Sequence, residues 1–300
     1  MTTSASRATE TAAAAARDRA RMRRPSLPGL LGFSVLILVA VAILFPLVYA
    51  VLGGFKTNGE LMANPGALLP TEWVFTNYTD VLFGEYAPTF WRQALNSLIV
   101  ASVAVVLTVA LASGAAFVFA RMVFPGREAF YLLFVFGLLF PSAVAILPLY
   151  ILIRELGLSA NPLGVALPQA AFALPITIVI LRPFFRSIPA ELEDAARIDG
   201  CGTFGFFWRI LLPLARPALA TVSVLALVST WNAFFLPLVI LNGADQWTLP
   251  LGVMNFSSEY SSDRARVLAY TVVTMVPAVV FYLIAERHIV SGLTSGSVKG

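Results

Sequence analysis

The segment QALNSLIVASVAVVLTVALASGAAFVFA, residues Gln93–Ala120, contains no Asp, Glu, Lys, Arg or His. A helix needs about 20 such residues to cross the hydrocarbon core of a bilayer, because each residue advances it by about 1.5 Å. A helix also satisfies its backbone hydrogen bonds internally, which the interior of a membrane requires. The segment therefore predicts a membrane-spanning helix.

Five further segments meet the same test of length and apolar content. They are Gly29–Gly53, Ala129–Ile153, Leu163–Leu181, Leu211–Leu241 and Val267–Ala285. The segment that begins at Leu163 contains prolines, which membrane helices tolerate when neighbouring helices satisfy the freed carbonyls. We therefore predict an all-α, polytopic membrane protein whose six transmembrane helices form one domain over residues 29–300.

The composition agrees with a membrane protein and excludes several functional classes. Of the 300 residues, 59% are hydrophobic and 12% are charged, whereas soluble domains carry about 25% charged residues. The single cysteine, Cys201, and the single histidine, His288, cannot form a disulfide framework or a His/Cys metal cluster within one chain. We expect no metal site. The basic residues are scattered at span ends, which does not indicate nucleic-acid binding.

The distribution of Lys and Arg predicts the orientation in the cell membrane. With the N-terminus inside, fifteen of the 20 basic residues fall on inner segments, and such residues are retained on the cytoplasmic side. Both termini are therefore expected in the cytoplasm. Residues 1–28 are poor in large apolar side chains and are expected to form a disordered cytoplasmic tail.

The six predicted spans lack the groups that several membrane functions require. Their cores contain no Asp, Glu, Lys or His, so a proton relay has no titrating sites. An ion-coupled secondary transporter of small polar solutes stays open as an alternative, because sodium can bind carbonyl oxygens. An enzyme that acts within the membrane would need a nucleophile with its base, and the sequence shows no such pair. Neither lysine, Lys56 or Lys299, lies in a phosphate-binding loop, so any ATP hydrolysis would occur on another chain.

The longest inner loop, residues 187–213, predicts a short helix of its own. Pro189 suits the first helical position and Gly200 suits the left-handed residue that ends a helix. Helical spacing places Leu192, Ala195, Ala196 and Asp199 on one face. Thr203 is expected to cap a second stretch, Phe204 to Ile210. These residues alone leave two interpretations open, an interfacial loop packed on its own bundle and a helix that docks on a partner.

The same loop resembles a known signature, E-A-A-x-x-x-G-x(9)-I-x-L-P. It is similar to the membrane subunits of binding-protein-dependent ABC importers, whose fold is the type I importer membrane domain. The matching residues are Asp194-Ala195-Ala196, Gly200, Ile210 and Leu212-Pro213. Asp194 stands where the family favours Glu, which keeps the charge but shortens its reach, and Cys201 stands where the family favours Ala.

Other stretches resemble the carbohydrate-uptake branch of that family, in particular the second membrane subunit of maltose-type systems. They are Phe55-Lys56-Thr57, Thr76-Asn77-Tyr78, Asn96-Ser97-Leu98, Trp231-Asn232 and the ending Gly292–Gly300. The resemblance implies a permease subunit for a sugar or oligosaccharide. It also implies four partners: a second six-span permease chain, a dimeric ATP-binding subunit that holds ATP and Mg, an extracytoplasmic solute-binding protein and membrane lipid. This chain itself is expected to bind no cofactor.

The resemblance also implies roles for individual residues. The residues expected to couple this chain to the ATPase are Glu193, Asp194, Ala195, Ala196, Asp199 and Gly200. Asn96, Trp231 and Asn232 are candidates for the solute path, although each could instead make a structural bond between helices. Ser295, Ser297 and Lys299 in the C-terminal tail could contact the ATPase or form a frayed polar end.

Overall fold

The computed structural model describes residues 27–256 and 263–294, with side chains over 31–256 and 263–283. Within these ranges all regular structure is helical, as predicted. The chain divides into two compact units, Met1–Leu52 and Gly53–Gly300. The first holds nearly all of helix α2, Leu27–Gly53. Most of the tail expected over residues 1–28, and the tail residues Ser295, Ser297 and Lys299, lie outside the described ranges.

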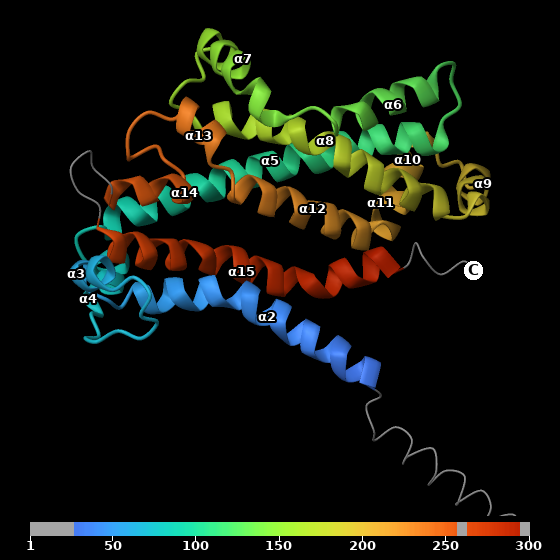
Figure 1. Ribbon diagram of the computed structural model, residues 1–300. Coiled ribbons are helices and arrows are strands. Elements are labelled where there is room, and N and C mark those ends of the chain that lie inside the picture. The colour runs from blue at the N-terminus through green and yellow to red at the C-terminus, as the bar shows by residue number, and fades with distance from the viewer. Residues whose placement is uncertain (1–26, 257–262, 295–300) are drawn as a thin grey trace, which may run out of the picture. The chain divides into compact units, whose positions relative to one another are not determined.

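The second unit is built around two long helices, α5 (Ala87–Arg121) and α8 (Pro162–Ser187). They run side by side, and α12 (Arg216–Trp231) packs against both (Figure 1). Ala112 and Ala116 of α5 are fully buried, and small side chains of this kind let membrane helices approach closely. Helix α15 (Arg264–Thr294) lies along α12 and completes the bundle.

Among the residues that the structure describes, four helices are long and apolar enough to cross a membrane. They are Leu31–Gly53, Ala87–Arg121, Pro162–Ser187 and Arg264–Leu283. These correspond to the first, second, fourth and sixth predicted spans. Pro168, Pro175 and Pro183 all lie inside α8, so the prolines do not interrupt that helix.

The third and fifth predicted spans are not single straight helices, which corrects the prediction. The third consists of α6 (Arg127–Gly137) and α7 (Ser142–Glu155), which meet at 96°. The chain between them ends at Pro141, whose extended backbone cannot continue a helix. The count is six only if each bent pair is one span.

The fifth predicted span, Leu211–Leu241, is broken twice. A bend of 77° separates Thr203–Leu214 from α12, close to Pro213 and Pro217, which lack the N–H that a continuous helix needs. Helix α12 then ends at Trp231, and a separate short helix, α13, covers Phe235–Ile240. The segment is apolar throughout, and hydropathy alone does not report these breaks.

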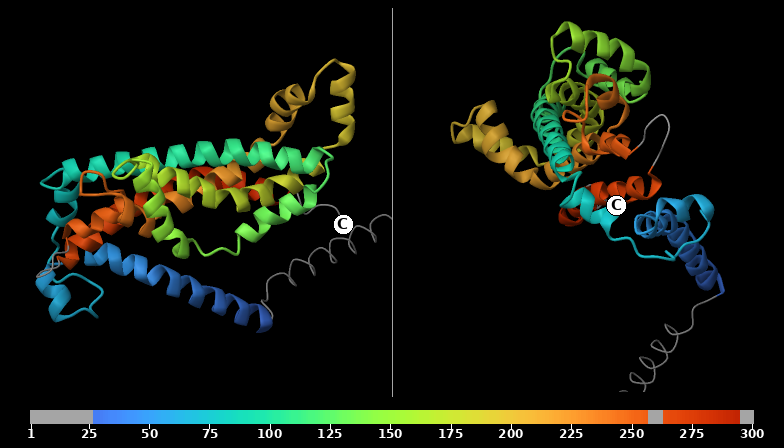
Figure 2. Two further views of the ribbon diagram at one scale, coloured as in Figure 1. Left: turned by 90° about the horizontal axis from the view of Figure 1, so that it is seen from above. Right: turned by 90° about the vertical axis from the view of Figure 1, so that its left-hand side faces the viewer.

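Short elements gather at the two ends of the second unit. Helix α9 (Ala190–Ile198), α10 (Thr203–Phe206), the π-helix η1 (Phe207–Leu211) and α11 (Leu212–Leu214) lie at one end (Figures 1 and 2). Helices α3 (Asn58–Ala63), α4 (Thr76–Leu82) and α14 (Leu249–Gly252) and the 3-10 helix η2 (Val253–Phe256) lie towards the other (Figure 1). The loop that carries the signature therefore lies at the opposite end of the unit from α3, α4 and α14 (Figure 1).

Candidate functional site

Helix α9 confirms the short helix predicted after Ser187, with one shift at its start. The helix begins at Ala190, and Pro189 precedes it with an extended backbone, φ −53° and ψ 138°. Pro189 is therefore the last residue before the helix and not its first residue. Glu191 and Glu193 lie in the first turn and Arg197 in the last, which matches the sign of the helix dipole at each end.

The end of α9 is a Schellman turn centred on Gly200. The N–H of Cys201 donates to the carbonyl of Ala196 at 2.8 Å, and the N–H of Gly200 donates to that of Arg197 at 3.0 Å. Gly200 has φ +78°, as predicted for a left-handed residue. No atom lies within 4 Å of where a Cβ would stand, so conformation and not space requires glycine here.

Most of α9 is exposed to solvent. Asp194, Ala195 and Asp199 are exposed, and Ile198, the most exposed apolar side chain of the helix, is 86% exposed. Ala196 is 5% exposed and packs in the core of its own chain. The two alanines of the signature therefore face in different directions, and only Ala195 is available on the open side.

One edge of α9 is fastened to the bundle. Ala196 joins a buried cluster with Ile188, Phe206 and Leu211. Beside it, Glu193 is largely buried and accepts a hydrogen bond from Arg197 at 2.7 Å. Glu193 also lies 3.9 Å from the guanidinium of Arg121, the last residue of α5. Contacts with the bundle therefore hold one side of α9, and its other side is exposed.

The stretch after α9 differs in detail from its prediction. Gly202, not Thr203, holds the position before α10, and Thr203 makes no capping hydrogen bond. The chain then forms a π-helix over Phe207–Leu211. Phe204 and Trp208 are exposed, whereas Phe207 is buried. These exposed aromatic side chains extend the open surface beyond α9.

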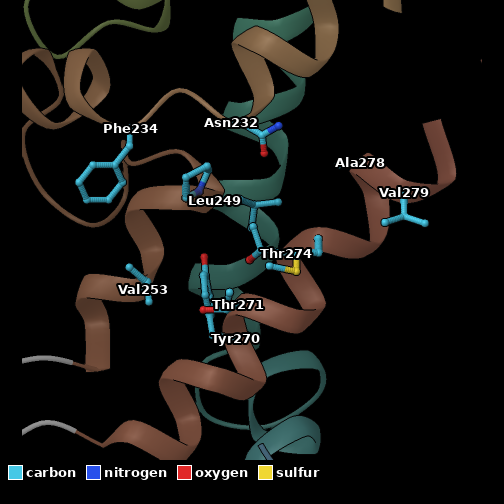
Figure 3. Close-up of a pocket in the computed structure, with 11 residues that line it drawn as sticks. Asn232, Phe234, Leu249, Val253, Tyr270, Thr271, Thr274, Ala278 and Val279 are labelled. Atoms are coloured by element: carbon cyan, nitrogen blue, oxygen red, sulfur yellow. The ribbon is translucent and has the colours of Figure 1, made fainter. Parts of the chain in front are cut away.

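The predicted solute-path residue Asn232 lies at the end of α12 and not deep within a helix. Its side chain donates to the carbonyl of Val228 at 3.0 Å and is exposed. Asn232 lines two cavities of about 390 and 370 Å³. In the first, shown in Figure 3, Tyr270, Thr271 and Thr274 of α15 supply the other polar groups. In the second, the polar groups are Ser142, Gln169 and Ser229.

The other two solute-path candidates have structural contacts in this chain. The amide of Asn96 donates to the carbonyls of Asp245 and Trp247, at 2.9 and 3.1 Å, and so holds the loop before α14. Trp231 is 5% exposed and packs against Phe281 with 5.7 Å between ring centroids. Neither residue lines the two cavities that contain Asn232.

Two stretches that the sequence analysis singled out meet in space. The side chain of Asn77 donates to the carbonyls of Gly54 and Lys56, at 3.0 and 2.9 Å. Lys56 is fully buried and lies 3.7 Å from Glu60. Desolvation alone would raise the pKa of Glu60, but the N–H of Thr71 and the ammonium of Lys56 outweigh it and hold that pKa below its usual value. This cluster stabilises the fold around α3 and α4.

Sequence reasoning missed two groups of buried polar residues. One is Arg121, which contacts both α8 and α9. The other is Gln93, whose side-chain oxygen accepts from the hydroxyl of Tyr270 at 2.6 Å and whose amide donates to the carbonyl of Ala244 at 3.0 Å. A polar residue at each end of an otherwise apolar helix was a visible signal, but its partner could not be read from the sequence.

Residues 108–289 match the family described as binding-protein-dependent transport system inner membrane component. The chain is 36% identical over 272 residues to the diacetylchitobiose uptake system permease protein NgcG of Streptomyces coelicolor, covering 89% of this chain and 87% of that protein. It is 36% identical over 272 residues to the arabinooligosaccharides transport system permease protein AraQ of Halalkalibacterium halodurans, covering 90% and 95%. It is 35% identical over 237 residues to the trehalose transport system permease protein SugB of Mycobacterium tuberculosis, covering 78% and 85%.

The fold is similar to that of a solved structure described as a bacterial ABC transporter involved in the import of the acidic polysaccharide alginate. The TM-score is 0.74 at 24% sequence identity, and the match covers 88% of this chain and 97% of that one. At this identity the likeness concerns the fold alone.

These findings confirm the predicted class of a multi-pass membrane permease subunit of an ABC importer, which is not an enzyme. The ion-coupled transporter considered from composition receives no support from them. Since the family match covers more than half of the chain and the relatives are similar over nearly their full length, this protein belongs to the family of binding-protein-dependent transport system inner membrane components.

Proposed function

We propose that this chain forms part of the path for a sugar or oligosaccharide and couples that path to a separate ATP-binding subunit through α9. The observation that carries the proposal is the exposure of α9. Asp194, Ala195 and Ile198 are open to solvent while Ala196 is buried in the chain's own core. A helix held along one edge and free along the other can pass a displacement on its free side to the bundle beneath it.

The residues of the site have three roles under this proposal. Asp194 and Asp199 supply charge and hydrogen-bond acceptors to the ATPase, and Ala195 allows its surface to approach closely. Gly200 reverses the chain after the helix, as its φ of +78° requires. Glu193 and Ala196 face the bundle and transmit the displacement inward.

The relatives support a carbohydrate as the solute, because their names refer to diacetylchitobiose, arabinooligosaccharides and trehalose. We propose that the chain works with a second six-span permease chain, a dimeric subunit that binds ATP and Mg, and an extracytoplasmic solute-binding protein. The excess of Lys and Arg on the segments assigned to the inside supports cytoplasmic termini. Of the three candidates, Asn232 is the one that we place on the solute path.

The test is reconstitution of this chain with its partner subunits in proteoliposomes. ATP hydrolysis is measured while the solute-binding protein is offered a panel of disaccharides and oligosaccharides, with polyols and glycerol phosphate as comparison solutes. We expect one class of saccharide to stimulate hydrolysis and to accumulate inside the vesicles. Uptake by this chain alone, driven by an ion gradient and without ATP, would refute the proposal.

The docking part has its own test. Asp194→Lys and Ile198→Asp change the open side of α9, and both are expected to release the ATPase subunit during purification. Arg186→Gln, which changes an exposed basic residue near the end of α8, is the control and should retain it. If both α9 variants kept the ATPase and its stimulation, α9 would not be the docking helix.

A further inference from the structure

Arg121 stands at a junction of three helices. It is the last residue of α5, and its side chain is 9% exposed. Its guanidinium donates to the carbonyl of Phe185 at 2.8 Å and to the carbonyl of Ile188, at the end of α8. The same guanidinium faces the carboxylate of Glu193 on α9 at 3.9 Å.

Both kinds of contact have a clear physical basis. The last carbonyls of a helix have no partner within the helix, and a basic side chain can satisfy them. The guanidinium offers five N–H donors in a fixed plane and stays charged at any physiological pH. Arg121 can therefore bind two carbonyls of α8 and one carboxylate of α9 together.

Helices α8 and α9 are joined through the backbone, whereas α5 and α9 are joined through side chains. Helix α9 follows α8 after only Ile188 and Pro189, so any displacement of α9 reaches α8 through the backbone. Helix α5 has no such covalent connection to α9. Within the described residues, Arg121 provides the ion pair between them, next to the packing of Ala196 in the cluster that also holds Ala116 and Phe119 of α5.

We propose that Arg121 is a positioning residue that makes α5 follow α9, so that the central pair of helices moves as one body when the ATPase moves α9. This inference rests on the proposed docking of α9. It predicts that loss of Arg121 leaves the ATPase attached and weakens the connection between α9 and the end of α5, which then depends on the packing of α5 against α8.

A second buried arginine provides a matched control. Arg182 of α8 donates to the carbonyl of Phe119 at 3.2 Å, bonds to Glu128, and lies 3.8 Å from the ring centroid of Tyr131. It joins α8 to α5 and α6 and, among the described residues, makes no hydrogen bond or ion pair with α9. A change at Arg182 therefore disturbs the same end of the bundle and leaves the ion pair between Arg121 and Glu193 in place.

The experiment uses the full transporter complex in nanodiscs, with Cys201→Ser to remove the native thiol. Spin labels are attached at Glu191→Cys on α9 and Leu111→Cys on α5, both exposed positions. The distance between the labels is measured without nucleotide and with Mg-ADP-vanadate. Stimulation of ATP hydrolysis by the solute-binding protein and retention of the ATPase are measured on the same preparations.

In the parent protein we expect one narrow distance distribution in both states, because α5 and α9 move together. With Arg121→Gln the distribution should shift or broaden on adding Mg-ADP-vanadate, and stimulation should fall at least about fivefold, the lower end of typical coupling between sites. With Arg182→Gln it should match the parent. Arg121→Lys, which keeps a cation and N–H donors toward the same acceptors, should recover a narrower distribution and part of the stimulation, whereas a loss equal to that of Arg121→Gln would contradict a role for this charge.

Two outcomes distinguish a failure of the role of Arg121 from a failure of the proposed docking of α9. If Arg121→Gln behaves as the parent does in both measurements while Asp194→Lys releases the ATPase, the role of Arg121 is refuted and the docking of α9 stands. If Asp194→Lys neither releases the ATPase nor lowers stimulation, the docking of α9 is refuted, and the role of Arg121 is refuted with it.

Discussion

Gly200 offers the sharpest test of how α9 is presented to a partner. Its φ of +78° lies in the left-handed region, and its N–H and that of Cys201 close the Schellman turn. The space where a Cβ would stand is empty, so a substitution meets no clash and the cost is conformational. For a non-glycine residue this conformation costs about 1–2 kcal/mol, and more for a β-branched one.

The perturbation is Gly200→Val. In the free permease the exposed segment after α9 can relax to negative φ, and docking must then restore the turn. A cost of about 1–2 kcal/mol corresponds to a loss of affinity for the ATPase of roughly 5–30-fold. Gly200→Asn is the control at the same position, because Asn tolerates the left-handed conformation.

The assay is titration of labelled ATPase subunit onto the permease pair in nanodiscs. Gly200→Asn should bind within about twofold to threefold of the parent, and Gly200→Val should lose at least the affinity of the range above, because Val is β-branched. Gly202→Asn, two residues further on, should be neutral, because φ there is −70° and Asn is favoured before a helix. If Gly200→Val and Gly200→Asn bound equally well, the turn would not govern docking.

Further predictions concern packing and charge. Ala196→Leu should lower the unfolding temperature of the permease, because overpacking a buried site costs about 1–3 kcal/mol; Ala195→Leu should leave that temperature unchanged and weaken ATPase binding, and the reverse pattern would contradict the assignment of faces. Asp194→Lys should weaken ATPase binding more in low salt than in high salt, and an effect independent of salt would exclude a charge contact. Gly252→Ala should lower the unfolding temperature, because the added methyl group would meet the hydroxyl of Tyr270 and the side-chain oxygen of Gln93; an unchanged unfolding temperature would contradict this packing.

The sequence predicted the features that depend on local chemistry. Long apolar segments indicated the membrane helices, including α8 in spite of its three internal prolines. Gly200 indicated the end of α9, and the structure has the predicted left-handed residue there. The signature around Asp194 indicated the family, which the comparisons confirm. Each of these depends on residues within about one helical turn or one span, so the order of amino acids is sufficient.

Other predictions failed because they depended on neighbours that the sequence does not name. Hydropathy predicted one span from Leu211 to Leu241, because a bent segment and a straight one can have equally apolar side chains. It therefore placed Asn232 inside a helix, whereas the residue follows the end of α12 at the edge of two cavities.

Local sequence was enough to predict that this protein crosses the membrane, which loop carries the signature and where its short helix ends. The packed helices were needed to show that Ala195 faces outward and Ala196 inward, and that Arg121 meets Glu193. The reason is physical. The free energy that keeps apolar segments in the bilayer is a property of each segment, whereas burial of one alanine and pairing of two distant charges depend on how separate helices pack together.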